Sequence, residues 1–389
     1  MTQPTNSLRG RVAIIGAGMI DFGELFSMSL EEMIEQAYLN ALASVDKGLD
    51  AGEIEAAWLG TVYPAMGNTG LVLAHATGLF DIPVTRVENA CATGSDAFRN
   101  ASMAVAAGIY DVALVVGAEK MRDEPGGLIA RSALKKLWLG RGVTMPAYFG
   151  LRATAYMERY GVGREGIAAV SVKNHANGVK YPHAHLRINC SLDEVLKAPY
   201  VSYPLGLYDC CPVTDGAAAL LICRAELAQR YTDSPVYLLG SGLATDSFVR
   251  GGDLTSFKAT QEAARQAYEM AGLGPEQINV AEIHDCFSIT ELISYEDLGF
   301  APAGRGAELL EAGTVMLEGE RPINPSGGLL SKGHPLGATG VAQLVELYEQ
   351  LRGQAGAVQV KEPQFALQHN IGIGRWATGS VGCVHILGR

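Results

Sequence analysis

Cys91 is the residue of this chain best placed for nucleophilic chemistry. It stands between an extended stretch, residues 84–90, and a helix built largely of small residues, 92–108. Unpaired backbone N–H groups and the dipole at a helix N-terminus favour an anion, so the pKa of this thiol is expected to fall and its thiolate fraction to rise. The alternative is a buried structural cysteine, which is what most free cysteines are. The neighbouring sequence alone leaves both interpretations open.

A second candidate, His334, lies in the glycine-rich stretch 327–340. Pro335 restricts His334 to extended conformations, and the surrounding glycines allow close backbone approach. An imidazole beside a thiol is the usual arrangement for generating and using a thiolate. Taken alone, however, a Gly-His-Pro tripeptide is more often a turn with an incidental histidine.

Two further stretches carry groups for proton transfer or anion binding. Residues 281–288, Ala-Glu-Ile-His-Asp-Cys-Phe-Ser, supply His284 and Cys286 at the expected end of a strand. Each could donate a hydrogen bond or move a proton, and the alternative interpretation is a metal ligand or a plain core segment. Residues 369–374, His-Asn-Ile-Gly-Ile-Gly, form a glycine turn whose free backbone N–H groups could bind an oxyanion.

Composition narrows the class of protein. The chain has 389 residues, 48% of them hydrophobic and 18% charged, with 47 glycines, which is typical of a packed α/β enzyme with two or more domains. A formal net charge of −11 argues against general nucleic-acid binding. We expect no signal peptide, peroxisomal address or membrane span, because no suitable apolar run or terminal motif occurs. Seven scattered cysteines without paired metal spacing indicate a reduced, cytoplasmic protein.

The elements that must position these residues alternate between strand and helix. Apolar runs that end at glycines, and helices that begin at capping residues such as Ser29, predict a mainly parallel sheet covered on both faces. Strands or extended segments are expected at 11–18, 56–61, 84–90, 112–117 and 215–222, and helices at 29–45, 71–78, 92–108 and 148–160.

The pattern is interrupted once and then begins again. Residues 121–207 are richer in Arg, Lys, His and Tyr, and are expected to form a lid or binding loop outside the core. Near residue 234 the order of elements restarts, which favours an internal duplication. The domains are therefore predicted as a first half (1–120 plus 208–233), the excursion (121–207) and a second half (234–389). Pseudo-two-fold packing would bring the equivalent turns that carry Cys91 and His334 face to face.

Together these stretches resemble the thiolase family over essentially the whole chain. The resemblance is carried by CATGS at 91–95, by NPSGGLLSKGHPLGATG at 324–340, and by the final glycine turn before residues 380–387. HDCF at 284–287 replaces the Asn-Glu-Ala-Phe motif of the commonest thiolases, and HNIGIG stands where those enzymes carry Cys-Ile-Gly-Gly-Gly. These changes, and SVKNH at 171–175, resemble the sterol-carrier-protein branch. The implied fold is a five-layered αβαβα arrangement of two duplicated βαβαβαββ halves with an inserted loop domain.

The resemblance also implies roles for individual residues. Cys91 resembles the nucleophile that becomes acylated, and His334 resembles the base that activates it and helps to hold a thioester oxygen. In this branch the acid/base role passes to Cys286, because Asn370 occupies the position of the cysteine used elsewhere in the family. Cys383, in the terminal strand, is interpreted as structural.

Two oxyanion sites complete the expected machinery. His284 would help to form the first, and the backbone N–H groups of Cys91 and Gly372 would form the second. Such a set of groups needs no metal and no redox cofactor, and its substrates would be coenzyme A thioesters. The basic residues of the excursion could meet coenzyme A phosphates, although such a run is more often a solvated face. They are Lys173, His175, Lys180, His183, His185 and Arg187.

The predicted activity is that of an acyltransferase that forms or cleaves a C–C bond between acyl-CoA units through an acyl-cysteine on Cys91. One alternative is a thiolase-like retro-aldolase acting on a β-hydroxyacyl-CoA, although such proteins depart at the catalytic cysteine positions that this sequence keeps. Another is a non-catalytic acyl-CoA-binding subunit of a larger complex. The resemblance further implies a homodimer or tetramer and a small companion protein with OB-fold and zinc-ribbon parts. Neither nucleic acid nor membrane is an expected partner.

Overall fold

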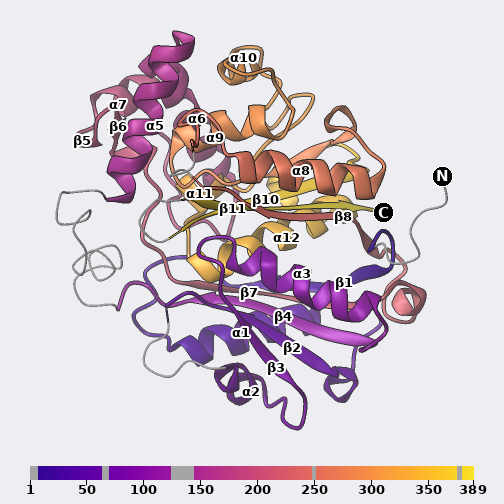
Figure 1. Cartoon of the computed structure of the whole chain (residues 1–389). Helices are drawn as coiled ribbons and strands as arrows, with labels where there is room; N and C mark the ends of the chain where they lie inside the picture. The colour runs from indigo at the N-terminus through magenta and orange to yellow at the C-terminus, as the bar shows by residue number, and fades with distance from the viewer. Residues whose placement is uncertain (1–7, 64–69, 124–143, 248–250, 375–378) are drawn as a thin grey trace.

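The central sheet joins strands from both ends of the chain (Figure 1). The computed structural model describes residues 8–63, 70–123, 144–247, 251–374 and 379–389. In these ranges nine strands pair in the order β3-β2-β4-β7-β1-β8-β11-β10-β9. The first half contributes β1 (Val12–Met19), β2 (Ala56–Gly60), β3 (Val84–Val87), β4 (Val112–Glu119) and β7 (Gly216–Arg224). The second half contributes β8 (Val236–Thr245), β9 (Val280–Glu282), β10 (Phe365–Ile373) and β11 (Ser380–Gly388).

The two halves repeat one pairing pattern, which confirms the predicted duplication. In the first half β2 pairs parallel with both β3 and β4, while β7 pairs antiparallel with β4 and with β1. In the second half β9 pairs parallel with β10, and β11 pairs antiparallel with β10 and with β8. An isolated parallel bridge between Ala281 and Ile323 takes the place that β3 has beside β2. The halves meet where two residues of β1 pair with β8.

The prediction of a mainly parallel sheet is wrong. Among the described residues, five of the eight strand pairings in this sheet are antiparallel. β1, β4 and β7 are wholly or almost wholly buried, so their sequences read as continuous apolar runs that carry no information about direction. β7 also enters the sheet after the long excursion and not after a single crossover helix, which is the connection that makes neighbouring strands parallel.

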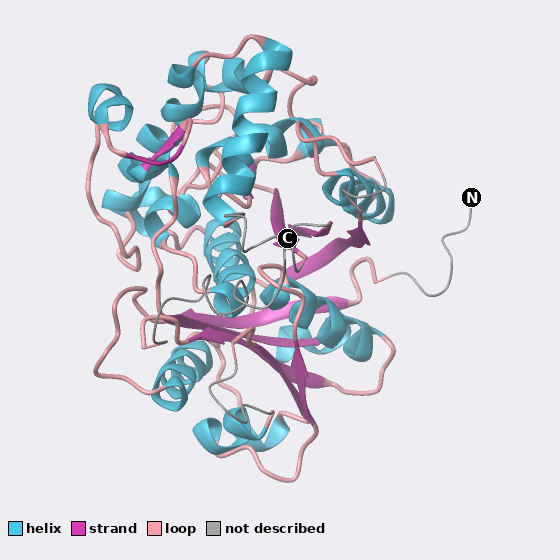
Figure 2. Ribbon diagram, turned by 60° about the vertical axis from the view of Figure 1, so that its left-hand side comes forward, coloured by secondary structure: helices cyan, strands magenta, loops and turns pink. Residues whose placement is uncertain are grey.

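Five layers follow from the helices, as the thiolase-like fold requires (Figures 1 and 2). α1 (Leu30–Ala43) and α2 (Leu71–Thr77) belong to one outer layer, and α8 (Lys258–Ala271) covers β8 and β11 in the second half of the sheet. Between the two halves of the sheet lie α3 (Thr93–Ala106) and α12 (Leu336–Arg352), which contact strands of both halves. Fourteen of the seventeen residues of α12 are buried, as expected for a helix enclosed on all sides.

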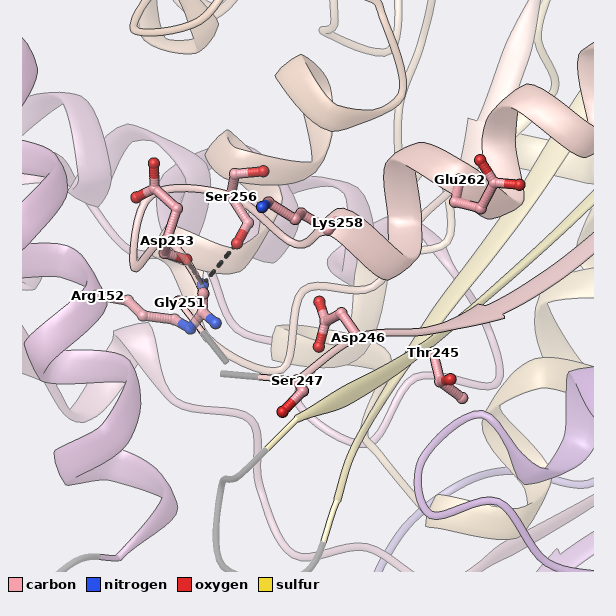
Figure 3. Close-up of a pocket in the computed structure, with 10 residues that line it drawn as sticks. Arg152, Thr245, Asp246, Ser247, Gly251, Asp253, Ser256, Lys258 and Glu262 are labelled. Carbon is pink, nitrogen blue, oxygen red and sulfur yellow. Dashed lines mark hydrogen bonds between the residues drawn. The ribbon is translucent and has the colours of Figure 1, made fainter. Parts of the chain in front are cut away.

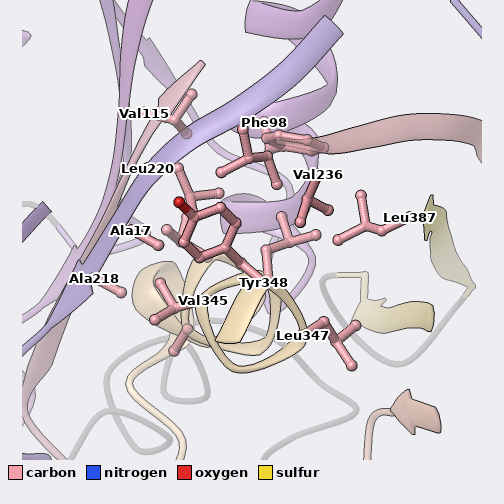
Figure 4. Packing of buried hydrophobic residues seen from close by; sticks show 14 of the residues in the cluster. Ala17, Phe98, Val115, Ala218, Leu220, Val236, Val345, Leu347, Tyr348 and Leu387 are labelled. Carbon is pink, nitrogen blue, oxygen red and sulfur yellow. The ribbon is translucent and has the colours of Figure 1, made fainter. Parts of the chain in front are cut away.

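Local sequence explains where these helices begin and what they bury. The Ser29 side chain accepts a hydrogen bond from the Glu32 N–H at 3.1 Å, and the Glu32 carboxylate accepts one from the Ser29 N–H at 2.7 Å, so a capping box starts α1. In the central layer Tyr348 of α12 packs among apolar side chains of β1, β4, β7 and α3, such as Phe98 and Leu220 (Figure 4). This packing fixes α3 and α12, and with them the turns at their N-termini.

The excursion is more regular than the sequence suggested. Its described part holds α5 (Met145–Tyr160), α6 (Arg164–Lys180), α7 (Leu192–Lys197) and a small hairpin of β5 (Tyr200–Ser202) and β6 (Leu205–Gly206). Three further helices, α9 (Ser288–Asp297), α10 (Gly306–Glu311) and α11 (Gly328–Lys332), lie between β9 and α12 in sequence. The exact division of the chain into domains stays a prediction. Among the described residues no helix is long and apolar enough to cross a membrane.

Candidate active site

The nucleophile candidate Cys91 sits on a tight turn immediately before α3. Ala90 holds a left-handed backbone conformation with φ of +50°, which is unusual for a residue other than glycine. The Thr93 side chain closes the turn, since its hydroxyl donates to the Ala90 carbonyl oxygen at 2.5 Å and accepts from the Asn89 N–H at 2.8 Å. The sharp turn therefore has a specific local cause, and it fixes the direction of the Cys91 side chain.

The turn that carries His334 lies against the Cys91 turn through glycine contacts. A Cβ at Gly94 would lie 2.6 Å from the carbonyl oxygen of Gly337, so only glycine allows the two backbones to approach this closely. Gly94 follows Cys91 by three residues, and Gly337 follows His334 by three residues. The predicted face-to-face packing of equivalent turns is thus present in the fold.

The side chains of Cys91, His284 and His334 meet at this contact. Their potential ligand atoms, one sulfur and two ring nitrogens, all lie within 4.8 Å of one another. The two imidazole rings pack edge to face with centroids 5.1 Å apart. His284 and His334 are both buried, with exposed fractions of 1% and 4%. Residues 243 positions apart in sequence therefore form one cluster, which is also a donor set of the kind that zinc accepts.

Hydrogen bonding assigns the tautomer of His334, that is, which ring nitrogen carries the hydrogen. The Thr339 hydroxyl donates to the Pro335 carbonyl oxygen at 3.0 Å, so it accepts from His334 Nδ1–H at 2.7 Å. His334 Nε2 is then the atom with the lone pair, and it has no hydrogen-bond partner among the described residues. Burial lowers the pKa of His334 to about 3, so the ring is neutral and able to accept a proton.

The expected low pKa of Cys91 is wrong. Burial raises the pKa of this thiol to about 12; a hydrogen bond from the Ile373 N–H to the sulfur opposes the rise, and the charge of Glu119 adds to it. Cys91 as a whole residue is only partly buried, but the environment of its sulfur outweighs the helix N-terminus. The resting site therefore contains a neutral thiol beside a neutral imidazole, and the thiolate forms when His334 removes the proton.

Cys286 is held beside the same cluster by the segment before β7. It is buried, and the Cys211 N–H donates to its carbonyl oxygen at 3.1 Å across a short antiparallel contact. Burial raises the pKa of Cys286 well above its usual range, and the proximity of the Cys211 and Cys91 thiols adds to the rise. Cys286 is thus a neutral thiol that carries its proton at rest. Nothing in the sequence singles out Cys211, because adjacent cysteines without a metal spacing carry no specific signal.

The expectation of a glycine turn with free N–H groups at 369–374 is wrong, because residues 369–373 are the end of strand β10 and pair with β11, and the Gly374 N–H donates to the Gly379 carbonyl oxygen at 2.9 Å. This strand end still reaches the Cys91 turn: a Cβ at Gly372 would lie 2.5 Å from the Asn89 carbonyl oxygen, so glycine permits the contact. The N–H that contacts the Cys91 sulfur belongs to the next residue, Ile373. Asn370 lies in a buried amide network, accepting from Ser95 Oγ at 2.8 Å. Cys383 is fully buried in β11.

Two buried carboxyl groups that the sequence did not reveal anchor the segments that carry the histidines. The Asp285 carboxylate accepts hydrogen bonds from the N–H groups of Leu329 and Leu330 at 2.6 and 3.2 Å, which ties the HDCF motif to α11. Glu119, fully buried at the end of β4, accepts the Gly337 N–H at 2.9 Å and so fixes the turn of His334. A carboxylate at a strand end has no distinctive sequence pattern, and its burial becomes visible only in the fold.

The basic run of the excursion does not form one phosphate-binding face. Lys173 is 1% exposed and pairs with Glu291 at 2.8 Å, while His175 is also 1% exposed and packs against the ring of Tyr208. Both side chains therefore belong to the interior. Phe149 likewise packs in the core, stacked on Phe287 of the HDCF motif at 4.5 Å between ring centroids.

A separate pocket of about 350 Å³ opens beyond the end of β8 (Figure 3). Cys91, His284 and His334 are not among its lining residues. Arg152 borders it, with the guanidinium donating to the carbonyl oxygens of Leu254 and Ser256. The other lining residues are Thr245, Asp246, Ser247, Gly251, Gly252, Asp253, Lys258 and Glu262. Cationic and anionic groups share this pocket. Because the catalytic candidates lie outside it, the pocket is distinct from the cysteine–histidine cluster.

Comparison with known proteins agrees with this geometry. The family model described as "Thiolase, N-terminal domain" matches residues 12–226, and that described as "Thiolase C-terminal domain-like" matches residues 240–389. An acetyl-CoA acetyltransferase of Methanothermobacter thermautotrophicus is 40% identical over 97% of this chain and 99% of its own length. Sterol carrier protein 2 of Bos taurus is 38% identical over 94% of this chain and 71% of its own length.

Solved structures share the fold at lower identity. The Ltp2-ChsH2(DUF35) aldolase superposes with a TM-score of 0.86 at 24% identity, covering 98% of each chain. Acetyl-CoA acetyltransferase from Syntrophomonas wolfei superposes with a TM-score of 0.72 at 19% identity, covering 97% of this chain and 98% of its own.

Fold and site thus define a duplicated α/β enzyme with a thiol–imidazole centre between its halves. The chain belongs to the thiolase family and is an acyltransferase. Its resemblance to the sterol-carrier-protein branch is confirmed by the similarity to sterol carrier protein 2.

Proposed function

We propose that this protein forms or cleaves a C–C bond between acyl-CoA units through an acyl-cysteine intermediate on Cys91. The observation that carries the proposal is the meeting of Cys91, His284 and His334 within 4.8 Å, with His334 Nε2 free to accept a proton. The reaction needs a soft nucleophile, a base beside it, a separate proton donor and two sites for carbonyl oxygens. The chain supplies a candidate for each requirement.

In the cleaving direction, Cys91 Sγ attacks the 3-keto carbon of a 3-ketoacyl-CoA as its proton passes to His334 Nε2. The carbonyl oxygen becomes an oxyanion that the Cys91 N–H, with the adjacent N–H of Gly372 or Ile373, would stabilise. The bond between C2 and C3 then breaks, leaving an acyl group on sulfur and an acetyl-CoA enolate.

The second half of the reaction returns the enzyme to its resting state. Cys286 protonates the enolate carbon while His284 hydrogen-bonds the thioester oxygen, and acetyl-CoA departs. The thiol of a free coenzyme A, deprotonated by the thiolate of Cys286, attacks the acyl-cysteine and forms the shortened acyl-CoA, and His334 returns its proton to the departing Cys91 sulfur. The condensing direction runs the same steps in reverse. No metal or redox cofactor enters these steps, and coenzyme A thioesters are the substrates.

Mass spectrometry after incubation with acetyl-CoA tests the intermediate directly. We expect an acetyl group on Cys91 and its complete loss in Cys91→Ala, with turnover reduced by several orders of magnitude. Cys190→Ala is the matched control, because Cys190 lies in a small separate cluster with Ala168 and Val195. Turnover that survives Cys91→Ala, with an unmodified Cys91 in the parent protein, would refute the proposal.

A retro-aldolase acting on a β-hydroxyacyl-CoA is the second candidate. The fold similarity to a solved protein named as an aldolase favours it. Retention of Cys91 beside the two histidines, and of Cys286 near Cys91, favours the thiol-dependent reaction instead. Thiolysis of 3-ketoacyl-CoAs of increasing length, run beside Cys91→Ala and Cys286→Ala, separates the two: an aldolase would keep its activity on the β-hydroxyacyl substrate without Cys91.

The proposal extends to assembly and location. We expect a homodimer or tetramer, and a small OB-fold and zinc-ribbon companion, as the solved neighbour's name pairs its chain with a DUF35 partner. Under the third alternative, a non-catalytic acyl-CoA-binding subunit, the isolated chain would bind substrate without turnover. All seven cysteines are free thiols in the fold, which agrees with the reducing cytoplasm as the proposed compartment.

A further inference from the structure

The cysteine–histidine cluster has more unpartnered donor atoms than a packed interior normally leaves. Both ring nitrogens of His284 are buried without a hydrogen-bond partner among the described residues, and so is His334 Nε2. Buried polar atoms are satisfied in most native structures, so three open nitrogens around one thiol point to a ligand that is held there. The proposed substrate would use some of these atoms during turnover.

We infer that Cys91, His284 and His334 form a binding site for a thiophilic divalent cation, with Zn²⁺ as the preferred ion. Sulfur and neutral imidazole are the ligands that zinc prefers, and three protein ligands plus water make a complete tetrahedral set. In such a set the donor atoms lie roughly 3.3–3.6 Å apart, from bond lengths of about 2.0–2.3 Å. The three donors here lie within 4.8 Å of one another, so the widest separation must shrink by roughly 1 Å for all three to bind one ion.

Outer contacts already orient two of the three ligands. The Nδ1–H of His334 donates to Thr339 Oγ1 at 2.7 Å, which directs the Nε2 lone pair to the cluster. A backbone N–H, that of Ile373, donates to the Cys91 sulfur and would also stabilise a metal-bound thiolate. Hydrogen bonds of this kind fix the geometry of ligands in metal sites.

Metal binding would shut off the proposed reaction, and in this respect the inference rests on the proposed function. Binding replaces the Cys91 S–H bond by an S–Zn bond, and the proton passes to water. The metal then occupies the sulfur lone pair that attacks the substrate and the Nε2 lone pair that accepts the proton. Zn²⁺ is therefore expected to act as a reversible inhibitor that competes with acylation of Cys91.

Binding is measured on the resting protein without substrate. We expect one Zn²⁺ per chain by calorimetry, and a sulfur-to-cobalt charge-transfer absorption when Co²⁺ replaces it. Cys91→Ser and His284→Asn should each weaken binding by more than about 100-fold, and Thr339→Val, which removes only an outer contact, by about 10- to 100-fold. Cys190→Ala should leave binding unchanged, because Cys190 lies in its separate cluster.

Inhibition is measured on the same preparations. Equimolar Zn²⁺ should abolish turnover, EDTA should restore it, and prior acetylation of Cys91 by acetyl-CoA should prevent metal binding. Unchanged affinity in Cys91→Ser, loss of the metal in Cys286→Ser alone, or faster turnover with Zn²⁺ would each overturn the inference. A protein that binds one Zn²⁺ yet never becomes acylated would refute the proposed function and leave the metal site standing. A protein that is acylated on Cys91 but binds no Zn²⁺ would refute the metal site and leave the proposed function standing.

Discussion

Removal of one member of a buried ion pair is expected to destabilise both histidine-bearing segments. Lys332 Nζ lies 2.9 Å from Glu282 Oε2, and both side chains are fully buried. Glu282 precedes His284 by two residues, and Lys332 precedes His334 by two residues. The pair therefore joins the end of β9 to the end of α11, directly behind the cluster. Lys332→Met keeps most of the side-chain volume but leaves the Glu282 carboxylate buried without its cation.

The magnitude follows from this burial. A charge left unpaired in the interior costs about 3–5 kcal/mol, whereas replacing both members of a pair by neutral groups is often nearly neutral. We expect Lys332→Met to lose about 3–5 kcal/mol of unfolding free energy. Adding Glu282→Gln to Lys332→Met should recover at least about 2 kcal/mol of that loss, because no charge of the pair is then left buried. Ser326 donates through its N–H and its hydroxyl to separate oxygens of the Glu282 carboxylate, so in the amide the N–H bond can be kept while the hydroxyl accepts from the amide N–H.

Urea unfolding of the parent, both single variants and the double variant gives the coupling energy as a double-mutant cycle. Measurements of kcat and KM on the same proteins show whether the segments that carry His284 and His334 keep their positions relative to each other. We expect kcat to fall more than KM rises, since the pair acts on the catalytic groups and not on the bulk of the substrate. A double variant no more stable than Lys332→Met would refute the reasoning, because the loss would then not come from an unpaired charge.

Two further predictions concern titration. Because burial holds the Cys91 pKa at about 12, alkylation of Cys91 by iodoacetamide should be slow at neutral pH and slower still in His334→Asn; fast alkylation that is independent of His334 would show a preformed thiolate. Burial lowers the pKa of His369 to about 3. Below pH 6.5 the unfolded chain therefore takes up a proton on this residue that the folded chain does not. The contribution of the buried neutral His369 to the free energy of unfolding is present above pH 6.5 and is lost as the pH falls toward 3. His369→Gln should therefore lose less stability than the parent between pH 7 and pH 5, by about 2 kcal/mol in urea unfolding, and an equal loss in both proteins would contradict this sign.

The family, the duplication and the main helices were readable from the sequence. Local signals carried them: Ser29 predicted the cap of α1, and the small residues after Cys91 predicted α3. The order of the motifs identified the family, because several separate motifs are unlikely to occur in the family's order by chance. Strand direction was not readable, since buried strands such as β7 have the same apolar run in either direction.

The types and spacing of residues determined which groups are available for chemistry here, namely two cysteines, two histidines and a glycine-containing stretch at 369–374. Only the tertiary structure decided how those groups behave. The Cys91 pKa depends on burial by segments far away in the chain, which outweighs the local helix dipole that the sequence reveals. For the same reason Lys173, apparently a surface cation, became half of a buried ion pair with Glu291. Desolvation is a property of the whole fold, whereas caps, turns and motifs are properties of a few neighbouring residues.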